Sequence, residues 1–258
     1  MSLSNNTHIE NPCKKWIEYS GKTGTFSYYD KETKTKIPIE KLRFVVLDEL
    51  ATITGFNENL KSGIYSNEVH NLSKQELNVK SFKPGISIKG LYSEIKDHVT
   101  SKGIGGRFCK NVYVLLAETS GMSLACIKME GAALNGWIDK KCKTYENIIV
   151  VDSFEDKKKG ANDYKMPVFT AVGKLEGVAL ENAKLQDVAL QEYFKYHENM
   201  KSAETKSDFL DAHSDETPQE NNYTEGVDYE AIAKEETSED NSVDAILTED
   251  DGKGDLPF

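Results

Sequence analysis

Lysine and aromatic residues are interleaved along three stretches of the chain, in a pattern that could bind a flexible polyanion. Lysines neutralise phosphate groups and flat rings stack on exposed bases, so a groove lined by both holds single strands without reading their sequence. The third stretch is flanked by Phe154 and Tyr164. The candidate residues are Lys14, Lys15, Trp16, Tyr19, Lys22, Tyr28 and Tyr29, then Lys89, Tyr92, Lys96, Arg107, Phe108 and Lys110, and then Lys157, Lys158 and Lys159.

The competing interpretation of each ring is a place in the core, since aromatic residues in strands are often buried. Phe44, Phe82, Tyr113 and Phe169 lie in apolar runs and are predicted to be core, as is Trp137. For Trp16 and Tyr28, which neighbour lysines and hydroxyl residues, both interpretations stay open. Phe26 and Tyr28 should share one face of a strand, with Tyr29 on the other. The lysine triplet is expected in a hairpin loop, either simply solvated or reaching across a groove.

Enzyme motifs fail when their spacing is checked. Gly21-Lys22-Thr23 lacks the first glycine of a phosphate loop, because Trp16 stands there, and Gly103-Ile104-Gly105 meets Phe108 where a dinucleotide fingerprint needs glycine. The four cysteines are widely spaced, with no histidine at metal-ligand spacing. We therefore expect reduced thiols, no metal or other cofactor, and no catalysis.

Charge divides the chain into two parts. Residues 1–200 hold 28 Lys and Arg against 25 Asp and Glu, a net of +3, whereas residues 201–258 hold 4 against 18, a net of −14. Few large apolar residues occur in the second part, so it is expected to be a disordered acidic tail. Such a tail can serve solubility alone or bind partners. No apolar run is long enough to span a membrane.

The tip of the tail is its most specific element. Asp250, Asp251 and Asp255 precede Leu256, Pro257 and Phe258. A ring followed by a terminal carboxylate is a peptide hook that a partner protein can capture. The tip resembles the C-terminus of bacterial and phage single-stranded DNA-binding proteins, although Gly252-Lys253-Gly254 interrupts the acidic run.

The segment 44–56, followed by 64–69, is similar to phage-encoded single-stranded DNA-binding proteins. This resemblance implies an oligonucleotide-binding (OB) fold, sequence-independent binding of single strands, and a tail that recruits replication and recombination proteins. It does not extend to the bacterial tetramer. A phage-encoded member would work in the cytoplasm of its host.

Short β-rich segments separated by glycine predict a mainly β protein. Strands are expected within residues 13–19, 25–29, 41–54, 64–69, 77–82, 86–92, 110–116, 122–129, 147–151 and 166–172, and helices within 131–141 and 180–200. Outside residues 13–82, the first helix has three strand candidates before it and two after it, as in an antiparallel OB barrel. Residues 13–82 would add an N-terminal β-region. The late helix packs on the sheet or binds a partner.

Together these features predict a non-catalytic protein that coats single-stranded DNA in replication, recombination and repair through residues 1–200, and recruits partners through the tip of 201–258. An RNA-binding OB-fold protein is one alternative, because a stacking groove accepts either sugar unless the 2′-hydroxyl is read. Another is an acidic adaptor or DNA mimic with no affinity for single strands.

Overall fold

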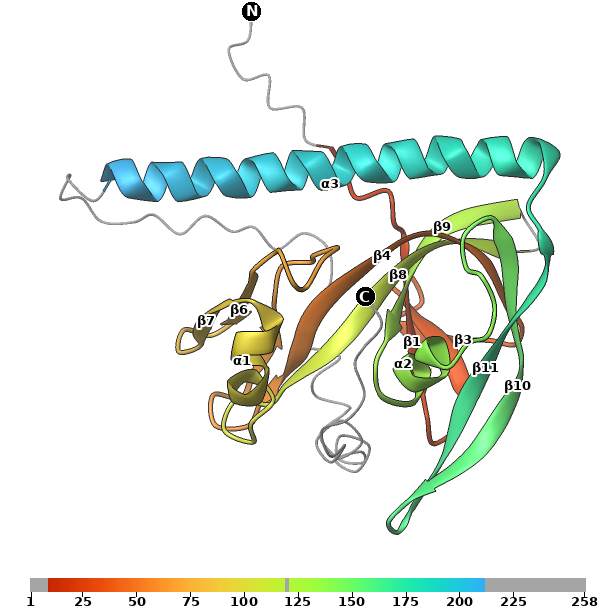
Figure 1. Ribbon diagram of the computed structural model, residues 1–258, viewed down its shortest axis with the longest axis horizontal. Helices are drawn as coiled ribbons and strands as arrows, with labels where there is room; N and C mark the ends of the chain where they lie inside the picture. Colours follow the sequence, from red (N-terminus) through yellow and green to blue (C-terminus); the bar gives the residue numbers. More distant parts are fainter. Residues whose placement is uncertain (1–8, 119–120, 212–258) are drawn as a thin grey trace, which may run out of the picture.

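The computed structural model describes residues 9–118 and 121–211, and these form eleven strands and three helices (Figure 1). The prediction of a mainly β protein is confirmed. The strands are β1 (Lys15–Ser20), β2 (Thr25–Asp30), β3 (Thr35–Ile39), β4 (Leu42–Asn57), β5 (Ser62–Tyr65), β6 (Leu77–Ser81), β7 (Ser87–Gly90), β8 (Gly106–Glu118), β9 (Gly121–Met129), β10 (Asn147–Lys159) and β11 (Asn162–Lys174). The helices are α1 (Tyr92–Val99), α2 (Gly131–Ile138) and α3 (Gly177–Asp211).

All eleven strands belong to one open, mixed sheet. Its main path runs β3-β2-β1-β9-β8-β4-β5-β6-β7, and β10 branches from β4 and carries β11. β1 and β9 pair in parallel, whereas the other strand pairs are antiparallel. The sheet curls so that its branch approaches its start: the amide of Lys165 in β11 donates to the carbonyl of Gly21, in the turn between β1 and β2, at 2.8 Å.

β4 is the axis of the molecule. Its first residues pair with β10, its middle with β8, and its end, Thr54–Asn57, with β5. At about 3.3 Å per residue, sixteen residues span at most about 53 Å. β4, with β8 paired along it, therefore joins a larger lobe, containing β1–β3, β9–β11, α2 and most of β8, to a smaller lobe of β5–β7 and α1 (Figure 1).

Three apolar clusters stabilise these parts. The larger lobe encloses the first cluster, where the Trp137 ring meets Phe169 edge-on at 4.9 Å and Phe44 lies beside both. The second cluster lies between the sheet and α3 and includes Leu115, Cys126 and Leu190. The third fills the smaller lobe around residues such as Ile53, Leu77 and Val99. Burial of Phe44, Tyr113, Phe169 and Trp137 confirms their predicted core positions.

The long helix α3 packs against the sheet, which settles the choice that the sequence left open. Ala183 and Leu190 are buried, and Phe194 meets Tyr113 edge-on at 5.0 Å. Gln191 also donates a hydrogen bond to Asp48 of β4 at 2.8 Å. The helix continues to Asp211, so the expected boundary at residue 200 falls inside a helix.

Several predictions about local structure were wrong. Lys157, Lys158 and Lys159 lie in β10 and not in a loop, because β10 and β11 stay paired out to Lys159 and Asn162. Phe82 is 52% exposed and not core. The sequence interpretation missed α1 and β3. β3 tolerates Pro38 because it ends the sheet path, where an amide donor is dispensable.

Candidate nucleic-acid interface

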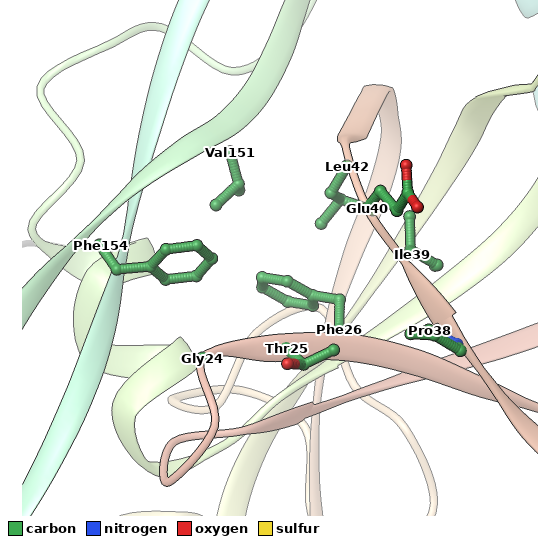
Figure 2. A pocket seen from close by; sticks show the side chains of 9 residues that line it. All are labelled: Gly24, Thr25, Phe26, Pro38, Ile39, Glu40, Leu42, Val151 and Phe154. Atoms are coloured by element: carbon green, nitrogen blue, oxygen red, sulfur yellow. The ribbon is translucent and has the colours of Figure 1, made fainter.

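An open cavity of about 200 Å³ lies where the curled sheet brings β10 close to β2 and β3 (Figure 2). We call this place the seam. Most of the lining is apolar, and the one ionisable side chain in it is Glu40. The residues that line the cavity are Gly24, Thr25, Phe26, Pro38, Ile39, Glu40, Leu42, Val151 and Phe154.

Two phenylalanines give the cavity its aromatic character. Phe26 is buried in the first cluster, whereas the Phe154 ring is 38% exposed. Figure 2 shows the Phe154 ring projecting from β10 toward Phe26. The Tyr19 ring also lies nearly parallel to Phe154, with centroids 6.3 Å apart and planes 10° apart. Phe154 is therefore held beside Tyr19 while more than a third of its surface stays exposed.

Tyr19 links β1 to β11 beside the seam. Its hydroxyl donates to the carbonyl of Lys165 at 2.8 Å, and its ring touches Phe26 with centroids 4.6 Å apart. Burial raises the pKa of Tyr19 above its ordinary value of 10, so the hydroxyl stays protonated and continues to donate. Tyr19, one of the predicted DNA-binding residues, thus lies beside the cavity and supports the two phenylalanine rings that line it.

A β-bulge explains how Phe154 reaches the cavity. Val151 pairs with Phe169 and Ser153 with Val168, so Asp152 is an extra residue in β10. In a regular strand, residues 151 and 154 would face opposite sides, but one inserted residue reverses the alternation beyond it. Phe154 therefore joins Val151 in lining the cavity. Alternation of residue types along the sequence carries no signal of this bulge.

The strands beside the cavity carry a positive excess. Residues 14–43 hold eight Lys and Arg against four Asp and Glu, a net of +4. Lys34 and Lys41 are exposed, and Lys36 forms a loose ion pair with Glu18 at 3.6 Å. Lys165, which pairs with Asp156 at 3.4 Å, lies at the edge: its side chain is over Gly24, since a Cβ there would come 2.6 Å from its Cδ. Anionic ligands would therefore meet favourable charge on this side.

The first predicted cluster is divided between binding and packing positions. Lys15 pairs with Glu118 and lies over the Tyr28 ring at 5.0 Å. Tyr28 is half-buried against the first cluster on the face of Phe26, and Tyr29 is 39% exposed, as expected for opposite faces.

Trp16 instead packs with the second cluster, edge-on to Tyr113 at 6.4 Å. Lys14, paired with Glu10, and Lys22 are exposed.

The structure does not bring the second predicted cluster to the seam. Tyr92 of α1 packs on Phe108 with ring centroids 5.0 Å apart, and burial raises the pKa of Tyr92. In the β4–β8 ladder, Arg107 is opposite Thr54 and Lys110 is opposite Ala51. Both positions lie toward the end of β4 that is far from Leu42. Lys110 forms an ion pair with Glu49 at 3.4 Å. Lys89 and Lys96 belong to the smaller lobe, where Lys89 pairs with Glu76.

The third predicted cluster projects along the β10–β11 hairpin, seen at the lower right of Figure 1. Its charge is balanced, because residues 152–165 hold four lysines and four acidic residues. Lys157 pairs with Glu155 at 2.8 Å and Lys158 with Asp163 at 3.8 Å. Exposed pairs of this kind contribute only about 0–1 kcal/mol, so phosphate groups can displace the carboxylates. Lys159, half-buried, ends the strand.

The proposed partner-binding tip, comprising Asp250, Asp251, Asp255, Leu256, Pro257 and Phe258, lies outside the described residues.

Reactive groups are scarce in the described part of the chain. All four cysteines are free thiols, and burial raises the pKa of Cys13 and of Cys109 to about 12, which suppresses the nucleophilic thiolate. Within residues 9–118 and 121–211, no group of three His, Cys, Asp or Glu side chains could hold a metal ion. The ordered polar contacts, such as the indole of Trp137 donating to Glu49 at 3.1 Å, tie the fold together.

Comparison of the chain with protein-family models, curated proteins and solved structures found no match. In the described residues, no helix combines the length and apolar character that crossing a membrane requires.

Proposed function

We propose that this protein binds single-stranded DNA without sequence preference and acts in replication, recombination and repair. The observation that carries the proposal is the seam cavity: an exposed Phe154 ring over an apolar hollow, beside strands with a net charge of +4. An unstacked base would lie against Phe154, and its phosphates would lie along the lysines of β1–β3 and of the β10–β11 hairpin. A base inside a duplex is stacked and paired, so it could not enter.

Strand pairing supports the proposal of an OB-like core. β4, β8 and β9 form an antiparallel meander, α2 follows, and β10 returns to β4 before β11. OB proteins bind oligonucleotides on strands two and three and through the loops after strands one and four. The corresponding segments here are β8 and β9, residues 58–105, and the β10–β11 hairpin.

This chain departs from that arrangement in one respect. Helix α3 covers the face of β8 and β9 that carries Tyr113 and Cys126. Part of the usual binding surface is thus occupied by the protein itself, which favours the seam as the place where a strand binds. Recruitment of replication and recombination proteins through the tip, and action in the cytoplasm of a host cell, belong to the same proposal.

The decisive experiment is a titration of fluorescent oligonucleotides, single-stranded and duplex, at several salt concentrations. Single strands should bind more tightly, and affinity should fall as salt rises because phosphate contacts release counterions. Phe154→Ala should weaken binding by about 1–3 kcal/mol. Val172→Ala, which shortens an exposed residue of β11 outside the cavity, is the matched control. Equal affinity for duplex, or affinity that does not change with salt, would disprove the proposal.

Competition between DNA and RNA homopolymers separates the proposed function from RNA binding. A protein that binds neither, even without its acidic tail, would instead be an adaptor or DNA mimic.

A further inference from the structure

Two aromatic rings stack on each other at the surface of the smaller lobe, away from the seam. Tyr65 of β5 and Phe82, which follows β6, have ring centroids 4.7 Å apart and planes 25° apart. Tyr65 is 38% exposed and Phe82 is 52% exposed. Ring pairs of this size are normally buried, because exposing their apolar surface to water costs free energy. Their position on the surface therefore suggests a role in binding.

The local backbone holds the Phe82 ring in place. A Cβ on Gly63 would come within 2.9 Å of the ring, so the ring lies directly over this glycine. The amide of Phe82 donates to the carbonyl of Gly63 at 3.1 Å, and the amide of Lys83 donates to Ser62 Oγ at 2.9 Å. The stack is thus positioned before any ligand arrives, which reduces the entropy cost of binding.

The third apolar cluster does not include these rings. Ile64 and Val79, on the strands that carry Tyr65 and precede Phe82, are buried in that cluster together with Ile86. Neighbouring residues of a strand face opposite sides, so the outward positions are left to the aromatic residues. Removing either ring should therefore leave the lobe folded.

Lysines lie in the segments that carry the stack. Lys80 is opposite Tyr65 in the β5–β6 ladder and so shares its face. Lys83 reaches the carbonyl of Lys61 at 3.0 Å, and Lys61 pairs with exposed Glu58 at 2.6 Å. Lys80 is exposed, and within residues 9–118 and 121–211 it has no ion pair. Rings flanked by cations match a base and its phosphates better than they match an apolar peptide.

We propose that the Tyr65–Phe82 stack is a second nucleobase platform, which holds the same single strand as the seam. This inference rests on the proposed function. Leu42, which lines the seam cavity, and Phe56, which pairs with Gly63 beneath the stack, are fourteen residues apart along β4. At about 3.3 Å per residue this is at most about 46 Å. Leu47 is a bulged residue between them, so the two places lie on opposite faces of β4. A long oligonucleotide that passes around the sheet can engage both places, whereas a short one reaches a single place.

The test compares oligonucleotides of about six and about 24 nucleotides, chosen around the known range of OB-fold site sizes, with the full-length chain. The variant Tyr65→Ala/Phe82→Ala should bind the long oligonucleotide about 5-fold or more weakly, because each stacked base contributes to affinity. Affinity for the short one should change by less than about 2-fold, since the seam remains. The separate variant Phe82→Tyr, which retains a ring over Gly63, should bind the long oligonucleotide as tightly as wild type. The melting temperature of both variants should stay at the wild-type value.

Each outcome has a distinct meaning. If wild-type protein binds single strands and the double variant binds the long oligonucleotide equally well, the platform is disproved while the seam proposal stands. If the wild type binds neither length, the proposed function fails, and the platform fails with it. A fall in the melting temperature of the double variant that Phe82→Tyr does not share, without any change in binding, would show that the stack only supports the lobe.

Discussion

Gly136 of α2 lies directly against the carbonyl oxygen of Pro167 in β11: a Cβ at position 136 would be 2.2 Å from that oxygen. No side chain fits between the helix and the strand here. This close approach lets the next residue, Trp137, enter the first cluster and meet Phe169. The glycine is therefore required by packing, since neither its backbone angles nor a turn demands it.

Gly136→Ala should lower the free energy of unfolding by about 1–3 kcal/mol, because the added methyl group must push α2 off β11. Gly173→Ala is the matched control, since nothing lies within 4 Å of a Cβ built at that position in β11. Urea denaturation monitored by Trp fluorescence measures both. Equal stability of the two variants would show that α2 does not pack as described.

Trp16 and Tyr29, both candidate DNA-binding residues from the sequence, should behave differently. Trp16→Ala removes a ring packed on Tyr113 and should cost about 2 kcal/mol of stability from lost apolar burial. Tyr29→Ala should change stability by less than about 0.5 kcal/mol, because the ring is exposed. Where Tyr29 stacks on a base, its loss should weaken single-strand binding. Melting temperatures and oligonucleotide affinities of both variants check this, and an unfolded Tyr29→Ala protein would refute it.

Glu118 should make the fold sensitive to acid. Burial raises its pKa, but hydrogen bonds from Lys15 and from Ser123 Oγ, the latter at 2.8 Å, outweigh burial and bring the pKa below 4.5. A lowered pKa in the folded state contributes stability above about pH 4.5, and this contribution is lost as pH falls through the folded pKa.

Glu118→Gln should therefore be less stable than wild type at pH 7, by about 1–2 kcal/mol from the weakened hydrogen bonds. The difference should shrink below pH 4.5. Glu58→Gln serves as control, because its pair with Lys61 is on the surface. Urea denaturation across pH measures the difference, and a gap that widens in acid would contradict the assignment.

The acidic tail should compete with DNA for the seam. Because α3 extends to Asp211, the deletion to make is 212–258, which removes two lysines and fifteen acidic residues, a net of −13. Tethering gives these charges a high effective concentration near the body. Deletion should therefore raise affinity for single strands, most strongly at low salt, where screening is weakest. An affinity unchanged at low salt would mean that the tail stays clear of the seam.

Removing only Leu256, Pro257 and Phe258 should leave DNA affinity nearly unchanged, since these residues add little charge. The same deletion should abolish recovery of replication proteins in a pull-down, because the ring and the terminal carboxylate form the hook. Equal recovery with and without the tip would reduce the tail to a charged segment.

The sequence by itself determined the elements whose local signal is strong. Runs of β-branched and aromatic residues located β4, β8 and β9, and the spacing of apolar residues located α2 and the first two-thirds of α3. Phe44 and Trp137 were recognisable as core, because each stands within an apolar run. The charge division between body and tail is likewise a property of composition.

Tertiary structure alone decided which face of each element is covered. Phe82, predicted to be core, is exposed, and Trp16, for which both interpretations stayed open, packs on the second cluster. Burial depends on what packs across a strand and not on the residues beside it. The seam joins Phe26, Leu42 and Phe154, which are distant in sequence, and a single bulged residue in β10 turns Phe154 toward it. Register and long-range pairing set these relationships, and residue patterns read along one strand cannot encode which partner strand will arrive, or in what alignment.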